Sequence, residues 1–186
     1  MATATKVSAG GPKVSGAIFR APVGTTLPTD ASTALNSAFK ELGYISDDGL
    51  TNSNSVTSNK IKAWGGAVVL TIQDEKNDQF KFTPIESLNA EVLKAVYGDA
   101  NVSVDGTTGD ITVNATAAEA IEYAWVFDVA MRGGTLKRIV LPNAKISELG
   151  DIVYKSDAAI GYPITLDAFP DANGKTHYEY IHFATT

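Results

Sequence analysis

Apolar residues dominate residues 125–142 with a period of two, and this pattern predicts two apolar β-strands. Arg132-Gly133-Gly134 divides the stretch and is expected to form the turn of a hairpin. One face of the first strand carries Tyr123, Trp125, Phe127, Val129 and Met131, and the other carries Ala124, Val126, Asp128, Ala130 and Arg132. Because even the second face is half apolar, we expect both faces to be covered, either by the chain's own fold or by a second copy.

Two segments have the apolar spacing of amphipathic helices, residues 30–42 and 88–97. In the first segment, Asp30 is a candidate N-cap residue, and Gly43 suits the position just after the helix. The second segment has an apolar stripe of Leu and Val residues, and Gly98 should end it. The sequence therefore predicts a short helix at 30–42 and a packed helix at 88–97.

Residues 47–60 are a polar run that predicts a long loop, and long loops in compact domains tend to be functional or disordered. A hairpin is expected next, with strands at 68–73 and 79–85 and a turn at 74–78. Its core face would carry Leu70, Ile72, Phe80 and Phe82, and its polar face Thr71, Gln73, Lys81 and Thr83. Shorter strands are predicted near 101–104, 110–114, 158–169 and 175–183.

Short turns join most of these strands, which favours antiparallel pairing. The fold class is therefore expected to be mainly β: an antiparallel β-sandwich or barrel with one packed α-helix at about 88–97. Residues 1–16 are small and polar, so we expect an N-terminal arm that becomes ordered only on assembly. Residues 17–186 would form a single domain.

Composition excludes several classes of function. The 186 residues contain no cysteine, which excludes disulfides, thiolate zinc sites and cysteine nucleophiles. The 15 basic and 21 acidic residues give a formal charge of −6, and the basic pair Lys137-Arg138 is too small a cluster to predict tight binding of nucleic acid. No apolar run approaches the roughly 20 residues of a membrane helix, and the first residues do not resemble a secretory signal.

Few residues could carry chemistry. His177 and His182 are five positions apart in a predicted strand and should face opposite sides. Asp171-x-Asn173-Gly174 faintly resembles a calcium loop, but its twelfth position is His182 instead of Glu, so we interpret it as a turn. The adjacent carboxylates Asp47-Asp48 and Asp74-Glu75 are interpreted as solvated loop residues. We therefore expect no enzyme, no cofactor and no metal.

Several segments, in this order, carry a resemblance to a known family. They are residues 24–30, 42–51, 61–66, 88–98, 125–142 and 168–171. Together they resemble the major tail protein, the tail tube subunit, of long-tailed, non-contractile bacteriophages. The resemblance covers roughly residues 17–183 and is poor around 101–120 and in the first 16 residues.

This resemblance implies a β-sandwich flanked by a helix and a structural virion protein without catalysis. Six copies would form a ring, and rings would stack into a hollow tail tube that surrounds the tape-measure protein and conducts DNA during ejection. Tail terminator and distal tail proteins would be further partners, DNA would pass without tight binding, and no membrane would be involved. The protein would be made and assembled in the host bacterial cytoplasm and reside in the virion tail.

Two sets of residues are the site candidates under this interpretation. The inter-subunit candidates lie after the N-terminal arm and in the long polar segment, and are Ile18, Phe19, Asp47, Asp48, Leu50, Asn52 and Asn54. The lumen candidates form the polar face of the predicted hairpin and are Thr71, Gln73, Lys81 and Thr83.

Two alternatives stay open. A carbohydrate- or surface-binding β-sandwich would use an exposed aromatic row such as Tyr162, Tyr178 and Tyr180. A tube protein of a contractile injection machine would share the fold. Rings or tubes of the purified protein would favour a tube subunit, and single particles would favour the binding module.

Overall fold

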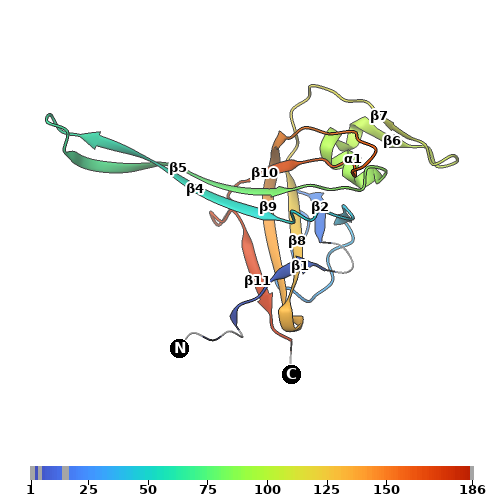
Figure 1. The fold of residues 1–186 in the computed structure, drawn as a ribbon, viewed down its shortest axis with the longest axis horizontal. Coiled ribbons are helices and arrows are strands. Elements are labelled where there is room, and N and C mark those ends of the chain that lie inside the picture. The colour runs from blue at the N-terminus through green and yellow to red at the C-terminus, as the bar shows by residue number, and fades with distance from the viewer. Residues whose placement is uncertain (1–2, 4–5, 14–16, 185–186) are drawn as a thin grey trace.

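The computed structural model describes residues 3, 6–13 and 17–184, so the expected arm at 1–16 lies partly outside the described residues (Figure 1). The strands are β1 (Gly10–Pro12), β2 (Ile18–Pro22), β3 (Lys40–Glu41), β4 (Thr51–Lys62), β5 (Val68–Phe82), β6 (Val102–Val104), β7 (Ile111–Val113), β8 (Tyr123–Met131), β9 (Leu136–Leu149), β10 (Ile164–Ala168) and β11 (Tyr178–His182). The one α-helix in these described residues is α1 (Ala90–Tyr97). The predicted fold class, mainly β with one helix, is confirmed.

The described strands form one large antiparallel sheet, and β6 and β7 form a separate pair. The sheet order is β3-β2-β8-β9-β10-β5-β4, with β1 also paired to β8 and β11 also paired to β9. Phe80 of β5 stacks on Phe127 of β8 with ring centroids 5.5 Å apart, although β9 and β10 lie between these strands in the sheet. In a flat sheet, strands three positions apart would be about 14 Å apart. The sheet therefore curls around a shared core.

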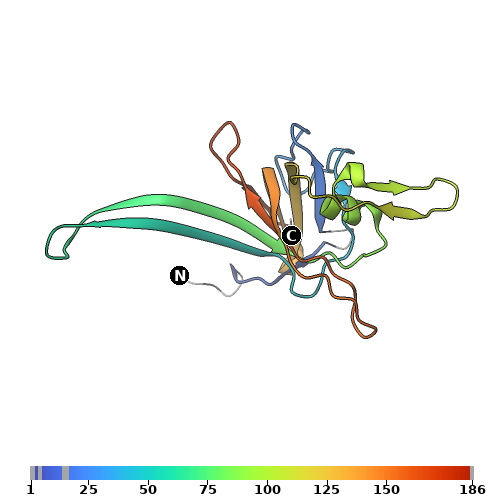
Figure 2. The same cartoon turned by 90° about the horizontal axis from the view of Figure 1, so that it is seen from above.

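Helix α1 packs on that core near β6 and β7 (Figures 1 and 2). Its buried residues are Val92, Leu93 and Ala95. Asn89 caps the first turn by accepting a hydrogen bond from the Glu91 N–H, and Gly98 ends the helix with a φ of 95°. The helix predicted at 88–97 is confirmed, two residues shorter at its start.

Strand β8 is buried on both faces, as its sequence pattern predicts. Trp125 and Phe127 lie in the core under α1, whereas Ala124 and Val126 belong to a second cluster on the opposite face. That second cluster is completed by segments 27–39 and 178–180 of the same chain. The sequence pattern allowed either the chain's own fold or a second copy to cover β8, and the structure shows that the chain's own fold covers it.

The helix predicted at 30–42 is wrong. Asp30 accepts hydrogen bonds from the N–H groups of Ser32 and Thr33, as an N-cap residue would, but the chain continues as turns and then β3. The Arg138 guanidinium donates to the carbonyl oxygens of Asp30 and Thr33, at 3.1 and 2.8 Å. A helix would need both carbonyls for its own ladder, so this contact from β9 stabilises the turn instead.

The C-terminal strands do not pair with each other as a hairpin. Both β10 and β11 pair with the same edge of β9, β10 at Ala144–Leu149 and β11 at Leu136–Val140. The predicted turn at 171–174 is present, and Asp171 accepts hydrogen bonds from the N–H groups of Asn173 and Lys175. It belongs to a loop that connects two strands lying end to end.

The region 47–85 differs most from its prediction. Residues 51–62, expected in a polar loop, form strand β4, and residues 68–82 form the single strand β5. The turn lies at 63–67, where the Ala63 N–H donates to Ala67 O, and not at 74–78. The two strands pair along their whole length, so the polar run is held by its backbone ladder despite having no apolar alternation.

Candidate functional site

The β4–β5 hairpin projects far from the body of the subunit (Figures 1 and 2). It is called the arm from here on and is distinct from the N-terminal arm expected at residues 1–16. All residues of β4 and residues 68–77 of β5 are exposed. From Val68 to Asp78 the arm extends about 33 Å at about 3.3 Å per residue. An isolated two-stranded ribbon is marginally stable in water, so the arm is a surface that a partner is expected to cover.

The arm exposes apolar side chains, mainly in its outer half. These are Val56, Ile61, Trp64, Val68, Val69, Leu70 and Ile72. Trp64 lies in the turn and is fully exposed. The turn geometry comes from Gly65 and Gly66, whose φ values are 106° and 90°, so the turn itself does not require a Trp.

The edges of the arm are also open. Among the described strands, β4 pairs only with β5, and the other edge of β5 pairs with β10 only from Gln79 to Phe82. Long open edges offer backbone N–H and C=O groups to another strand and invite pairing with a second chain. The opposite edge of the described sheet is β3, which has two residues.

A register shift gives the arm two different faces. Opposite Thr57 and Ser58 stand Glu75 and Gln73, so Asp74 is an extra residue in β5. An extra residue exchanges the faces of all residues beyond it. Leu70 and Ile72 therefore share the face of Lys81, and the expectation that they share a core face with Phe80 and Phe82 is wrong.

The same shift separates the lumen candidates. Thr71 and Gln73 lie opposite Lys60 and Ser58, on the face of the arm that also carries Lys62. Lys81 lies opposite Thr51 on the other face, and Thr83 is half-buried beyond the end of β5. The four residues do not form one continuous face.

Where the arm leaves the body, a buried carboxylate anchors it. Asp78 is 4% exposed and accepts hydrogen bonds from Asn52 of β4 and from the Thr176 hydroxyl, at 2.8 and 2.7 Å. The Nδ1 atom of His177 lies 2.5 Å from the second Asp78 oxygen, and the His177 ring packs edge-on against Phe80. Burial alone would raise the pKa of Asp78, but the hydrogen bonds from Thr176, Asn52 and His177 outweigh it, and the pKa is lowered.

The inter-subunit candidates lie in different environments. Asp47 and Asp48 are exposed in the loop before the arm, Leu50 is half-buried, and Asn52 and Asn54 are exposed on β4. Phe19 is half-buried in the second core cluster. Ile18 is 2% exposed, so its side chain is already enclosed by the subunit's own core.

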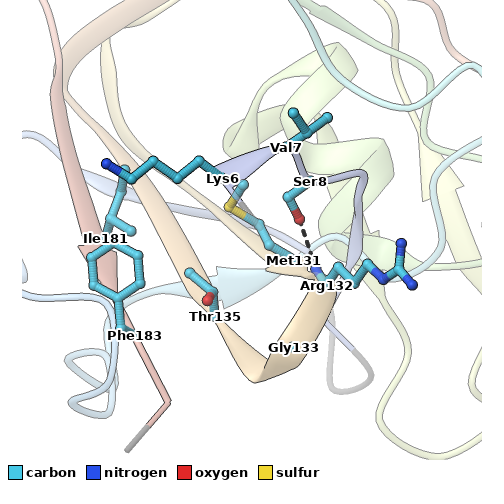
Figure 3. Close-up of a pocket in the computed structure, with 9 residues that line it drawn as sticks. All are labelled: Lys6, Val7, Ser8, Met131, Arg132, Gly133, Thr135, Ile181 and Phe183. Carbon is cyan, nitrogen blue, oxygen red and sulfur yellow. Dashed lines mark hydrogen bonds between the residues drawn. The ribbon is translucent and has the colours of Figure 1, made fainter. Parts of the chain in front are cut away.

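Two of the hollows on the body have apolar walls and lie next to the chain termini or the root of the arm. The first, the terminal pocket, has a volume of about 800 Å³ between the N-terminal segment, the β8–β9 turn and β11 (Figure 3). Its apolar walls are Val7, Met131, Ile181 and Phe183, and its charged lining residues are Lys6 and Arg132. Figure 3 shows Lys6 reaching towards Ile181, and Ser8 Oγ accepting a hydrogen bond from the Arg132 N–H at 2.8 Å.

The second hollow, the arm-root pocket, has a volume of about 680 Å³ between β1, β8 and the segment 45–52 that leads into the arm. Its half-buried apolar walls include Ile45, Leu50, Val129 and Met131. Its charged lining residues are Asp47, Asp128, Glu179 and Lys137. Asp128 pairs with Arg138 and Glu179 with Lys137, so among the described residues Asp47 is the lining charge without an opposite partner.

The tyrosines considered for a carbohydrate platform do not form one. Tyr178 and Tyr180 stack on each other and pack half-buried on the second core cluster, whereas Tyr162 is 4% exposed in the other. Within the part of the chain that the structure describes, no three His, Asp or Glu side chains gather as a metal site would require, and no helix is long and apolar enough to cross a membrane.

The chain was compared with curated proteins and with models of known protein families. No curated protein matches the chain. Residues 12–185 match the phage tail tube protein family. The matched region includes the arm, its buried root and both faces of β8. Because the match covers far more than half of the chain, this protein belongs to the phage tail tube protein family and is a structural component of the bacteriophage tail.

Proposed function

We propose that six copies of this protein form a ring and that the rings stack into the hollow tail tube of a non-contractile phage. The tube surrounds the tape-measure protein during assembly in the host cytoplasm and conducts DNA into the host during infection. Its ends bind the tail terminator and distal tail proteins. Family membership over residues 12–185 supports the tube, and the surface of the arm supports the assembly.

The observation that carries this proposal is the exposed arm. It extends about 33 Å beyond the body, exposes seven large apolar side chains and leaves both ribbon edges open among the described strands. Exposed apolar surface and open edges on this scale are aggregation liabilities in a monomer. A closed ring covers edges by pairing them between copies, and stacking covers surfaces that leave the plane of the ring.

Within a ring, neighbouring sheets would pair edge to edge into one inner barrel. In the strand order of the described sheet, β3 is the edge at one end and β4 the edge at the other, and β1 and β11, which each pair with one strand, have further open edges. The outer half of the arm extends past the body and would reach a copy in the next ring. Asp47, Asp48, Leu50, Asn52 and Asn54 lie at or near the arm root, where that copy would make contact.

The lumen must let DNA move. Each phosphate bound by Lys or Arg adds affinity that depends steeply on salt, and a wall that held phosphates would slow ejection. The chain's charge of −6 favours an acidic or mixed wall. Because the lumen candidates lie on two faces, either Thr71 and Gln73 or Lys81 and Thr83 would line the channel, not all four.

Electron microscopy of the purified protein tests this function. The wild-type chain should form hollow tubes of uniform diameter. A variant in which Asn-Gly replaces residues 58–74 shortens the arm but keeps its paired root, and it should stay folded without forming tubes. The matched control replaces residues 105–110 of the β6–β7 hairpin by Asn-Gly and should still form tubes. Tubes of normal yield from the arm variant would contradict the role of the arm.

A further inference from the structure

The arm tip and the arm-root pocket match each other in chemistry, but one copy cannot bring its own two parts together. The tip consists of residues 60–70 and lies far from the body in both views (Figures 1 and 2). The pocket lies where the arm begins, next to Leu50 and Asn52. The tip could therefore fill such a pocket only on a second copy.

Apolar surface is present on both sides. Trp64 is fully exposed at the end of the arm, and Ile61 and Leu70 face each other across the two strands just behind it. A buried Trp removes about 150–250 Å² from water and is enriched among the residues that dominate interfaces. The arm-root pocket offers the half-buried side chains of Ile45, Leu50, Val129 and Met131 as walls.

Charge selects between the terminal pocket and the arm-root pocket. Lys60 and Lys62 lie on one face of the tip, and the sequence has no acidic residue between positions 49 and 73. The terminal pocket is lined by the cations Lys6 and Arg132 and by no acid among its described lining residues, so it would repel the tip. The arm-root pocket has Asp47 in its lining, and Asp48 is exposed beside it.

We propose that the arm tip of one copy docks in the arm-root pocket of a second copy, with Trp64 in the apolar hollow and Lys60 and Lys62 facing Asp47 and Asp48. The inference rests on the proposed tube and specifies its contact. Each copy gives one tip and receives one tip, so the contact is heterologous and repeats from ring to ring without closing. Such a contact propagates a tube.

Zero-length cross-linking of wild-type tubes tests this contact without any substitution. A carbodiimide joins a lysine amine to a touching carboxylate as an amide, and the water that is lost converts the carbodiimide to a urea. In tubes grown from mixed ¹⁴N and ¹⁵N protein, we expect mixed-isotope peptides linking Lys60 or Lys62 to Asp47 or Asp48. The pairs Lys137–Glu179 and Lys145–Glu119 within one copy serve as the positive control.

The outcomes separate this contact from the proposed function. Tubes with both control links but no link from Lys60 or Lys62 to Asp47 or Asp48 would overturn the contact and leave the tube intact. Protein that forms no tubes at all would contradict the proposed function itself.

Charge exchange gives a second measurement. The double variant Lys60→Glu, Lys62→Glu loses two exposed ion pairs. The protein concentration needed for tube growth should therefore rise roughly tenfold. Adding Asp47→Lys and Asp48→Lys should restore growth, whereas Lys155→Glu on the exposed 150–160 loop should change nothing. Failure of the restored variant to grow better than the Lys60→Glu, Lys62→Glu variant would count against the pairing.

Discussion

The buried ion pair between Arg138 and Asp128 gives the sharpest prediction about the fold. Arg138 is 1% exposed and Asp128 5%. The Arg138 Nε and a terminal nitrogen donate to the two Asp128 oxygens at 2.6 and 2.8 Å, and the other terminal nitrogen holds the carbonyls of Asp30 and Thr33. Arg138→Leu leaves the carboxylate buried and the turn at 30–33 without its donor.

Breaking such a buried pair costs about 3–5 kcal/mol of unfolding free energy. For a chain of this length each kcal/mol corresponds to about 2–4 °C, so the melting temperature of Arg138→Leu should fall by about 6–20 °C. Urea denaturation of the monomer, followed by circular dichroism below the concentration of assembly, measures the loss directly. Lys137→Leu, which removes a partly exposed pair with Glu179, is the control and should cost no more than about 1 kcal/mol.

The double variant Arg138→Leu with Asp128→Leu distinguishes the pair from simple packing. It removes both charges and should recover at least half of the stability lost in Arg138→Leu, because the buried carboxylate, which the partly exposed Lys13 contacts only at 3.7 Å, is removed as well. A double variant as unstable as the sum of the two single variants would refute this reasoning, as would a single-variant cost below about 1 kcal/mol.

Three further predictions concern Asp78, Gly43 and strand β1. The pKa of Asp78 lies below its ordinary 3.8, so the stability that its carboxylate contributes is present above that value and is lost as the pH falls through the lowered pKa. Asp78→Asn should therefore be less stable than wild type at pH 7. A difference in unfolding free energy between the two proteins that does not shrink by pH 3 would contradict this. Gly43 has a φ of 69°, and a Cβ there would come within 2.1 Å of the Glu86 carboxylate. Gly43→Ala should therefore lower the unfolding free energy by about 1–2 kcal/mol, as measured by denaturation. The control Gly106→Ala, whose Cβ would meet open space, should change it little. Strand β1 (Gly10–Pro12) has three exposed residues, so its amides should exchange hydrogen quickly in the monomer and slowly in the tube; equal protection in both would show that assembly does not order it.

The sequence predicts well those elements whose side chains alternate between core and solvent or between two cores. Strand β8 and helix α1 are of this kind, and both were located to within two residues. The predicted helix at 30–42 is wrong because the carbonyls of Asp30 and Thr33 accept hydrogen bonds from the Arg138 guanidinium, which lies more than 100 residues away in the chain. No local pattern contains that information.

The arm could not be recognised from its composition. Its first strand has exposed side chains on both faces, so it lacks the alternation that marks a half-buried strand. The extra residue Asp74 then exchanges the two faces of β5 beyond it. A strict alternation of faces along the sequence therefore assigns Leu70 and Ile72 to the wrong face. The Asp78–His177 contact joins residues 99 positions apart and also leaves no sequence signal.

The polarity of the 47–60 segment nevertheless pointed to an exposed element. What it could not show was that a paired ribbon, and not a flexible loop, presents Lys60 and Lys62 at a distance from the body. The pairing matters for function, because a paired ribbon loses less conformational entropy than a loop when its tip binds a neighbour.

A cryo-electron microscopy map of the assembled protein tests the central claim most directly. The account predicts a hollow tube of stacked six-membered rings in which the arm of every copy crosses to the adjacent ring and is covered along its apolar residues. Single subunits, a closed particle, or a tube whose arms extend freely into solvent would contradict it.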